Sequence, residues 1–393
     1  MSMDIKALDS NYIMHTYGRN GVVIDRGKGS VLYGDDGKEY LDFGSGIGTL
    51  SLGTADSGYI QAVTDQLLKT QHVSNYFMCA PTAILAEKII FLSGFSKVFF
   101  ANSGAEANEG AIKTARKYSF DKYGKGRSTI VTFDKSFHGR TVTTLAATGQ
   151  DVFHQFFFPF TDGFKYCEYN NEDALKSALT DDVCAVMLEC IQGEGGVNVM
   201  TDSFASMLKE ECEKRDILII CDEIQTGIGR TGKLFAFETL NLRPNIFTLA
   251  KGLAGGLPIG AFVTDKKCSE VLSKGQHGST FGGNPVSCAA ANYVLDKISA
   301  PGFLQSVTDN GNYLRSRLKE IKSDKIMDIR GKGLMVGIQT SIPTGDFCSE
   351  ALNRGLFVLS AGKDVIRLLP PLIITKQELE HGIEILEKLF CEM

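Results

Sequence analysis

Several patterns that identify common protein classes are missing from this sequence. Its 10 cysteines form no Cys-x-x-Cys pair and no Cys/His cluster with metal-site spacing, so we predict no metal centre. There is no stretch of about 18 apolar residues, so we expect no membrane span. There is also no basic stripe, and the net charge is −5, so we predict no binding to nucleic acid.

The cysteines and the first residues bear on where the protein works. Cys184 and Cys221 stand inside apolar runs, where cysteine behaves as a small hydrophobic residue. The first six residues contain no apolar segment, so we expect no signal peptide. Together these features predict a reduced, cytoplasmic protein.

The order of patterns along the 393 residues predicts an α/β protein with two domains. Residues 21–43 alternate and turn like a small antiparallel meander. Helices are expected near 56–70, 81–93, 104–122, 202–215, 286–298, 302–322 and 376–391. Strands are expected at 97–101, 128–133, 183–188, 217–221, 246–249, 259–263, 334–339, 355–359 and 365–368.

This alternation of strands and helices predicts a mostly parallel central sheet with helices on both faces. We expect residues 56–285 to form the large domain. The N-terminal segment 1–55 and the C-terminal segment 286–393 would together form a smaller α+β domain from both chain ends.

Two apolar runs end in charged residues of opposite sign. Asp222 follows the run that begins at Ile217, and Lys251 follows the run from Asn245 to Ala250. Both runs read as buried parallel strands, whose carboxyl ends meet where α/β proteins bind ligands. A half-buried lysine there can lose its proton and attack a carbonyl, and a carboxylate can hold a pyridinium nitrogen protonated. Pyridoxal phosphate (PLP) chemistry requires such a pair, although two unrelated strand ends would give the same pattern.

Four further motifs follow apolar strands or precede helices. Ser103 and Glu106 form a capping box, and the small residues Gly104 and Ala105 would leave N–H groups open to a phosphate. The other three motifs are F-H-G-R (137–140), L-E-C-I-Q-G-E-G-G (188–196) and G-S-T-F-G-G-N-P (278–285). Each alone is equally well explained as a cap, a turn or a polar loop.

Taken together in this order, the motifs make the chain resemble the class III (ornithine-type) aminotransferases over essentially its whole length. The segments D-E-I-Q-T-G-I-G-R-T-G (222–232) and A-K-G (250–252) complete the set. The resemblance implies a PLP-dependent transferase of fold type I that acts as a homodimer with shared active sites. Within the class, the chain length and F-H-G-R are most similar to the enzymes that act on N2-acetylornithine.

The resemblance also implies a role for each matching residue. Lys251 would bind the aldehyde of PLP and then move a proton, and Asp222 would pair with the ring nitrogen. The other cofactor-binding residues would be Ser103, Gly104, Ala105, Phe137, Glu223, Ile224, Gln225 and, from the partner subunit, Thr280. Arg140 and Ser279 would contact the acylated donor. Arg367 would bind the α-carboxylate of glutamate and 2-oxoglutarate, and Glu194 would mask it during the other half-reaction.

The implied reaction transfers the δ-amino group of N2-acetylornithine to 2-oxoglutarate, a step of arginine biosynthesis. It would give N-acetylglutamate 5-semialdehyde and glutamate. Alternatives are transamination of ornithine, succinylornithine or 4-aminobutyrate, or an aminomutase of the glutamate-1-semialdehyde type. The stretch 44–50 lacks the tyrosine with which ornithine enzymes bind their substrate, which argues against free ornithine. An aminomutase would have no use for Arg367 and its masking Glu194.

Overall fold

A seven-stranded sheet lies at the centre of the computed structural model, which describes residues 4–393. Residues 1–3 of the predicted N-terminal segment lie outside this range. The strands, in spatial order, are β4 (Lys97–Ala101), β12 (Gly260–Thr264), β11 (Ile246–Leu249), β10 (Leu218–Asp222), β7 (Val183–Leu188), β5 (Thr129–Phe133) and β6 (Phe164–Cys167). β12 runs antiparallel to both β4 and β11, and the other four pairs are parallel, which confirms the mostly parallel sheet.

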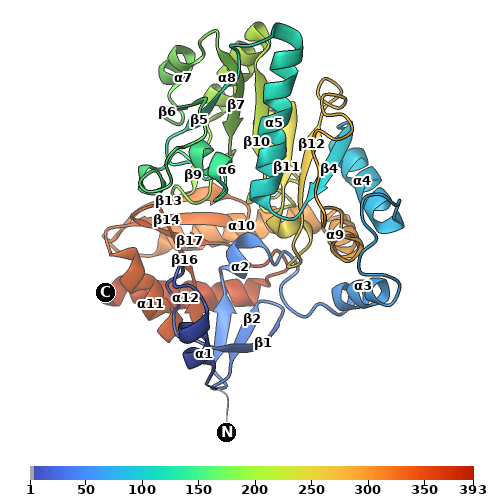
Figure 1. Cartoon of the computed structure of the whole chain (residues 1–393). Helices are drawn as coiled ribbons and strands as arrows, with labels where there is room; N and C mark the ends of the chain where they lie inside the picture. Colours follow the sequence, from blue (N-terminus) through green and yellow to red (C-terminus); the bar gives the residue numbers. More distant parts are fainter. Residues whose placement is uncertain (1–3) are drawn as a thin grey trace.

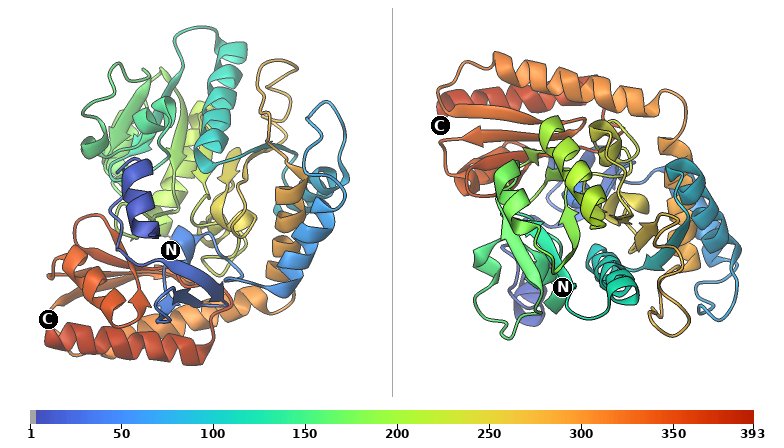
Figure 2. Two further views of the ribbon diagram at one scale, coloured as in Figure 1. Left: turned by 60° about the horizontal axis from the view of Figure 1, so that its bottom comes forward. Right: turned by 90° about the horizontal axis from the view of Figure 1, so that it is seen from above.

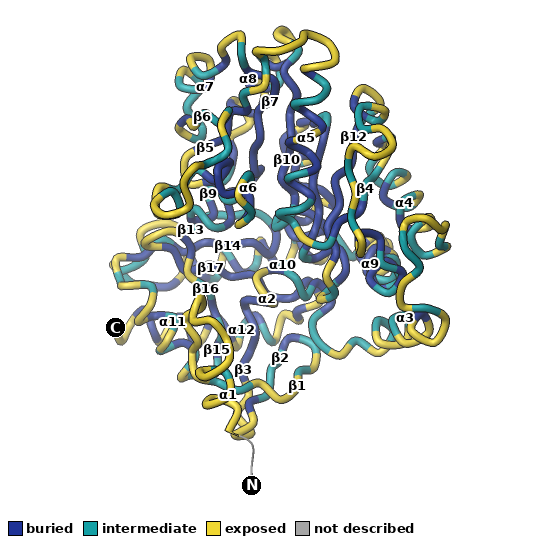
Figure 3. The backbone as a smooth tube through the Cα atoms, in the orientation of Figure 1, coloured by how far each residue is buried: buried dark blue, intermediate teal, exposed yellow. Residues whose placement is uncertain are grey.

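Helices cover both faces of this sheet, as the sequence predicts (Figure 2). Along β10, Leu218 and Ile220 pack in one apolar cluster with α5 (Gly104–Tyr123). Ile219 and Cys221 belong to a second cluster with Phe204 of α8 (Asp202–Arg215). Successive residues of a strand point to opposite faces, so α5 and α8 lie on opposite sides. This double burial is why β7 and β10 are apolar at almost every position (Figure 3).

The N-terminal and C-terminal parts of the chain lie together below the central sheet (Figure 1). The predicted meander is confirmed as β1 (Ile24–Lys28), β2 (Val31–Gly34) and β3 (Glu39–Asp42). Its fourth strand, β15 (Leu356–Phe357), comes from the C-terminal part and runs parallel to β3. A third sheet contains, in order, β13 (Ile326–Lys332), β14 (Met335–Thr340), β17 (Val365–Leu368) and β16 (Leu359–Ala361).

The remaining elements are shorter or lie around these sheets. The other helices are α1 (Ile5–Tyr12), α2 (Ser45–Gly48), α3 (Ser57–Leu67), α4 (Ala80–Ser93), α6 (Val142–Ala147), α7 (Glu172–Ala178), α9 (Pro285–Ile298), α10 (Phe303–Glu320), α11 (Thr344–Asn353) and α12 (Lys376–Glu392). A small hairpin pairs β8 (Ile191–Gln192) with β9 (Asn198–Val199), and three 3-10 turns are η1 (Asp151–Phe153), η2 (Ala236–Leu240) and η3 (Lys251–Leu253). No helix within residues 4–393 is long and apolar enough to cross a membrane.

Two local predictions are wrong in instructive ways. The single strand expected at 355–359 is two short strands, because the chain leaves the sheet of β3 at Phe357 and enters the sheet of β17 at Leu359. The capping box at α5 is only half formed. Ser103 accepts from the Glu106 N–H at 3.2 Å, but the Glu106 carboxylate accepts from the Asn102 N–H at 2.5 Å instead of closing on Ser103.

Candidate active site

A cavity of about 420 Å³ opens at the carboxyl ends of the central strands. Asp222 is the last residue of β10, and Lys251 lies two residues after the end of β11, at the start of η3. The predicted site residues that line the cavity are Ser103, Gly104, Ala105, Phe137, Arg140, Glu194, Asp222, Ile224, Gln225 and Lys251. The fold therefore brings together residues from five separate stretches of the sequence at one edge of the sheet, as the strand-end argument requires.

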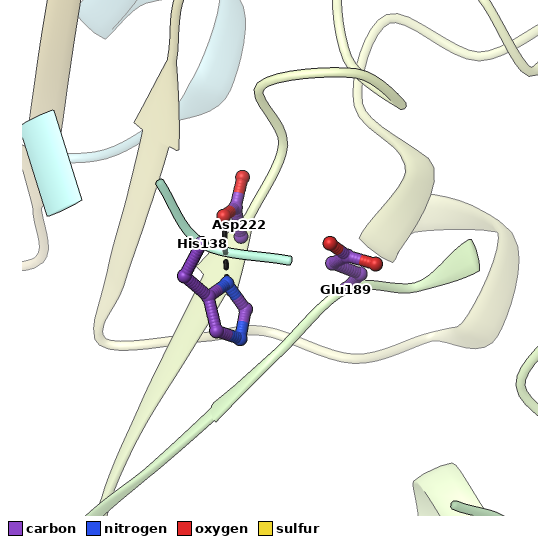
Figure 4. A group of neighbouring side chains, drawn as sticks. All are labelled: His138, Glu189 and Asp222. Atoms are coloured by element: carbon purple, nitrogen blue, oxygen red, sulfur yellow. Dashed lines mark hydrogen bonds and ion pairs between the residues drawn. The ribbon is translucent and has the colours of Figure 1, made fainter. Parts of the chain in front are cut away.

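Asp222 is held by three donors on the floor of the cavity. Its Oδ2 accepts from Asn108 Nδ2 at 2.8 Å and lies 2.8 Å from His138 Nδ1 (Figure 4). Its Oδ1 accepts from the Ile224 N–H at 3.0 Å. Asp222 is only 4% exposed, so this network fixes the direction of a nearly dry carboxylate. Our sequence reasoning missed Asn108, which lies two residues after Glu106 in α5, and His138, which stands inside the F-H-G-R motif.

Glu189 is a second buried carboxyl beside Asp222 that the sequence reasoning did not assign. Its Oε1 accepts from the Phe137 N–H at 3.2 Å, and its Oε2 has no partner within residues 4–393. Burial, and then the neighbouring Asp222 carboxylate, raise the pKa of Glu189 well above its ordinary value. Its position directly after β7 was the available signal, because Asp222 is placed in the same way.

Ligand atoms of His138, Glu189 and Asp222 lie within 4.8 Å of one another, a spacing that also suits a metal ion (Figure 4). His138 and Asp222 bond directly at 2.8 Å, which accounts for both groups without a metal. Burial also favours the neutral, weakly ligating form of Glu189. The absence of a metal centre stays a prediction.

Lys251 is a partly buried amine beside these carboxylates. Burial lowers its pKa from the ordinary value, and the nearby Arg367 acts in the same direction, against the carboxylate of Glu194. A lowered pKa increases the fraction of neutral amine, which is the nucleophilic form. The backbone of Lys251 has a φ of +40°, an uncommon value for a residue other than glycine. Strain of this kind occurs where the surrounding structure fixes a functional side chain.

Glu194 lines the cavity from the turn between β8 and β9, and it forms a closed ion pair with Arg367. Arg367 of β17 binds Glu194 through both nitrogens, with Nη1–Oε1 at 2.6 Å and Nη2–Oε2 at 3.1 Å. Gln225 joins the pair, donating to Glu194 at 3.1 Å and accepting from Arg367 at 3.0 Å. Burial opposes ionisation of Glu194, but Arg367 lowers its pKa below the ordinary value. Arg367 is 2% exposed, so the pair is a strong, charge-assisted contact.

The N-terminus of α5 forms the opposite end of the cavity. Gly104 and Ala105 begin a helix of 20 residues, whose first N–H groups carry partial positive charge. A Cβ on Gly104 would stand 2.7 Å from Cδ1 of Ile224, so any larger residue here would force the Ile224 side chain to shift. A small anionic group at this place would meet backbone donors without a side chain in the way.

Besides Arg367, which contacts the lining residues Glu194 and Gln225, three predicted residues lie outside this cavity. Glu223 turns away, and its carboxylate accepts from the N–H groups of Ala236 at 3.0 Å and Phe237 at 2.8 Å. Burial raises the pKa of Glu223 to about 7. Ser279 reaches only the rim, where its Oγ accepts from Asn102 at 3.1 Å. Thr280 is exposed and does not line the cavity of its own chain.

Comparison with known proteins places this arrangement in context. The family model described as "Aminotransferase class-III" matches residues 12–390. The acetylornithine aminotransferase of Haemophilus ducreyi is 51% identical over 395 residues and all of both chains. An ornithine aminotransferase structure from Toxoplasma gondii, described with PLP at its active site, has a TM-score of 0.95 and 32% identity, covering 99% of this chain and 94% of that one. The N-acetylornithine aminotransferase structure from Stenotrophomonas maltophilia has a TM-score of 0.86 and 35% identity, with 98% of each chain covered.

The residues of the cavity fit PLP. The cavity offers a lysine with a lowered pKa, an oriented carboxylate, an aromatic side chain and the open N-terminus of α5. These are the groups that suit an aldehyde, a pyridine nitrogen, a planar ring and a phosphate, respectively. The fold and the donor set thus agree on the same cofactor.

Proposed function

This chain belongs to the class III aminotransferases, and on that premise we propose that it transfers the δ-amino group of N2-acetylornithine to 2-oxoglutarate. The products are N-acetylglutamate 5-semialdehyde and glutamate. The chain is a PLP-dependent aminotransferase of the α/β fold type I. The proposed donor is supported by the Haemophilus ducreyi relative, whose name states acetylornithine and whose sequence aligns with this chain from end to end.

The roles of the cavity residues form part of this proposal. When bound, PLP supplies an aldehyde that captures the amine and a ring that withdraws electrons from the carbon beside it. Lys251 would hold the aldehyde and then carry the proton between donor carbon and cofactor, since its lowered pKa favours the neutral amine. Asp222, oriented by Asn108 and His138, would keep a proton on the ring nitrogen. Phe137 would cover the ring face, and Ser103, Gly104 and Ala105 would bind the phosphate.

The observation that carries the choice of reaction is the closed ion pair between Glu194 and Arg367. An uncovered arginine beside Lys251 would bind the α-carboxylate of the donor and present the wrong amine to the cofactor. With Glu194 bound to it, the arginine is neutralised while the δ-amine reacts. A dicarboxylic acid can displace Glu194 because it forms an equivalent bidentate contact. An enzyme that uses a single substrate, such as an aminomutase, needs no such exchange.

We further propose a homodimer in which each Thr280 completes the partner's phosphate site. Thr280 is exposed and lies outside its own cavity, while the phosphate end of that cavity is lined mainly by backbone and small residues. A two-fold axis would place both loops symmetrically. We also propose that the enzyme works in the cytoplasm, which agrees with ten free cysteines, most of them buried.

A panel of amine donors tests the proposed reaction. Purified enzyme with PLP and 2-oxoglutarate is given N2-acetylornithine, N2-succinylornithine, ornithine or 4-aminobutyrate, and glutamate is measured. We expect kcat/KM to be highest for N2-acetylornithine. A preference for ornithine or 4-aminobutyrate would contradict the donor, and turnover of an amino aldehyde without any oxo acid would contradict the reaction class.

A further inference from the structure

Arg140 stands at the mouth of the cavity without an anionic partner. It is exposed and lines the cavity, and it makes no ion pair or side-chain hydrogen bond with any residue from 4 to 393. Its guanidinium carbon instead lies 4.1 Å from the ring centroid of Phe153 and 5.5 Å from that of Phe137. The guanidinium therefore rests on an aromatic surface.

Phe153 is held in place by the segment that carries Arg140. The ring stands edge-on to Phe137 at 6.2 Å, with an angle of 70° between the planes. Just before the η1 turn, Gln150 donates its side-chain amide to the Ser136 carbonyl at 2.9 Å. The Gly149 N–H also donates to Ser136 Oγ at 3.0 Å. Residues 149–153 are thus fastened to the residue that precedes the F-H-G-R motif.

An arginine stacked on a ring keeps its hydrogen-bond donors free, whereas an arginine paired with a carboxylate does not. A guanidinium attracted to a ring face keeps its N–H donors in the plane available for bidentate bonds. Arg367 shows the opposite arrangement, because Glu194 occupies both of its terminal nitrogens. Of these two arginines, only Arg140 has a guanidinium that is held by an aromatic ring and is not paired with a carboxylate.

We propose that Phe153 is a positioning residue that holds the Arg140 guanidinium ready to bind the α-carboxylate of the amino donor. This inference rests on the proposed function, since it concerns the donor's binding mode. The family resemblance already implies that Arg140 contacts the acylated donor. The new element is the aromatic support, which makes Phe153 a determinant of specificity for amines that carry a carboxylate. The remaining aromatic side chains of the run 156–158 point into solvent and do not contact Arg140.

The test compares two donors that differ only in the carboxylate, N2-acetylornithine and N-acetylputrescine. Phe153→Leu removes the ring, Phe153→Tyr keeps it, and Phe156→Leu makes the same change at an exposed position of the same loop. For Phe153→Leu we expect KM for N2-acetylornithine to rise roughly 5- to 30-fold, with little change in kcat. We expect unchanged kcat/KM for N-acetylputrescine, and near wild-type values for both donors with Phe153→Tyr and Phe156→Leu.

A binding measurement on the PLP-loaded enzyme separates this effect from chemistry. N-acetylnorvaline carries the carboxylate but no δ-amine, so it can bind without reacting. Calorimetry should show a dissociation constant raised by the same factor in Phe153→Leu. In the Arg140→Leu background, Phe153→Leu should cause no further weakening, because Phe153 acts through Arg140. Equal losses for both donors, or additive losses in the double variant, would overturn the inference.

The test of Phe153 remains informative if the proposed donor is wrong. A wild-type preference for ornithine would refute the donor assignment alone. The effect of Phe153→Leu would then be measured with ornithine and putrescine, which also differ only in the carboxylate. Loss of discrimination with either matched pair supports the positioning role, and unchanged discrimination with both contradicts it.

Discussion

Two aspartates lie near the opposite ends of strand β10 and are used in different ways. Asp216 lies just before the strand, where it binds Lys122, Lys267 and the hydroxyls of Tyr118 and Tyr123. Asp222 ends the strand, where it is bound by neutral donors and His138 in a nearly dry pocket. The first network is partly exposed and joins α5 to the sheet, while the second surrounds a ligand cavity. The sheet thus separates stabilising contacts at its amino edge from the candidate active site at its carboxyl edge.

The largest expected effect is at Lys251. Lys251→Ala should abolish transamination, because no other lysine lines the cavity within the described chain. Borohydride treatment of the wild type should attach the cofactor covalently, and peptide mapping should locate it at Lys251. The variant should retain its fold, as read by circular dichroism. Wild-type turnover in Lys251→Ala would refute the assignment.

Asp222→Asn should remove chemistry while preserving the fold. The amide cannot hold a proton on the ring nitrogen, so we expect kcat to fall by about 10³-fold. PLP should stay bound through its phosphate, as measured by absorbance after gel filtration. Asn108→Ala removes one hydrogen bond that orients Asp222, so it should lower kcat roughly 10- to 100-fold. An unchanged kcat in PLP-loaded Asp222→Asn would contradict the proposed role of Asp222 at the ring nitrogen.

The shared site can be tested by mixing two inactive variants. Lys251→Ala and Thr280→Val each damage a different part of the site that we propose is built from two chains. After subunit exchange, a heterodimer holds one site with both lesions and one intact site, so about a quarter of wild-type activity should return. Each variant incubated alone serves as the control. No recovery after proven exchange would mean that each site belongs to a single chain.

The ion pair on the wall should divide the two half-reactions. Glu194→Ala leaves Arg367 uncovered, so it should slow the N2-acetylornithine half-reaction and increase reactivity toward α-amino groups. Arg367→Ala should mainly impair glutamate and 2-oxoglutarate. Single-turnover absorbance changes measure each half-reaction separately. If each variant slows both half-reactions by the same factor, the ion pair is only a structural contact.

The smallest effect is expected at the amino edge. Burial opposes ionisation of Asp216, but hydrogen bonds from Lys122 and Lys267 hold its pKa well below the ordinary value. This group therefore stabilises the fold above its unfolded pKa of about 3.9, and the contribution is lost as the pH falls below that value. At pH 7, Asp216→Asn should lower the free energy of unfolding by about 1 kcal/mol, since the lysines are partly exposed. Denaturant unfolding at pH 7 and pH 3 should show the difference shrinking at low pH, while kcat at pH 7 stays at the wild-type value.

The parts of the site that could be predicted are those that strand ends determine. Asp222 and Lys251 follow apolar runs, and the carboxyl edge of a parallel sheet brings such positions together. The contact between Arg367 and Glu194 joins β17 to the turn between β8 and β9, so only the family resemblance implied it. Asn108, His138 and Glu189 were missed because their roles depend on which neighbour they meet. The strand β6 was missed because Lys165 interrupts a short run at the sheet edge.

One measurement tests the central claim most directly. PLP-loaded enzyme is mixed with N2-acetylornithine alone, and the cofactor absorbance is followed; 2-oxoglutarate is then added. The account predicts that the donor converts the cofactor to its amino form, that 2-oxoglutarate restores the original spectrum, and that one glutamate forms for each N-acetylglutamate 5-semialdehyde. Absence of any spectral change with N2-acetylornithine, in enzyme that does respond to ornithine or 4-aminobutyrate, would contradict it.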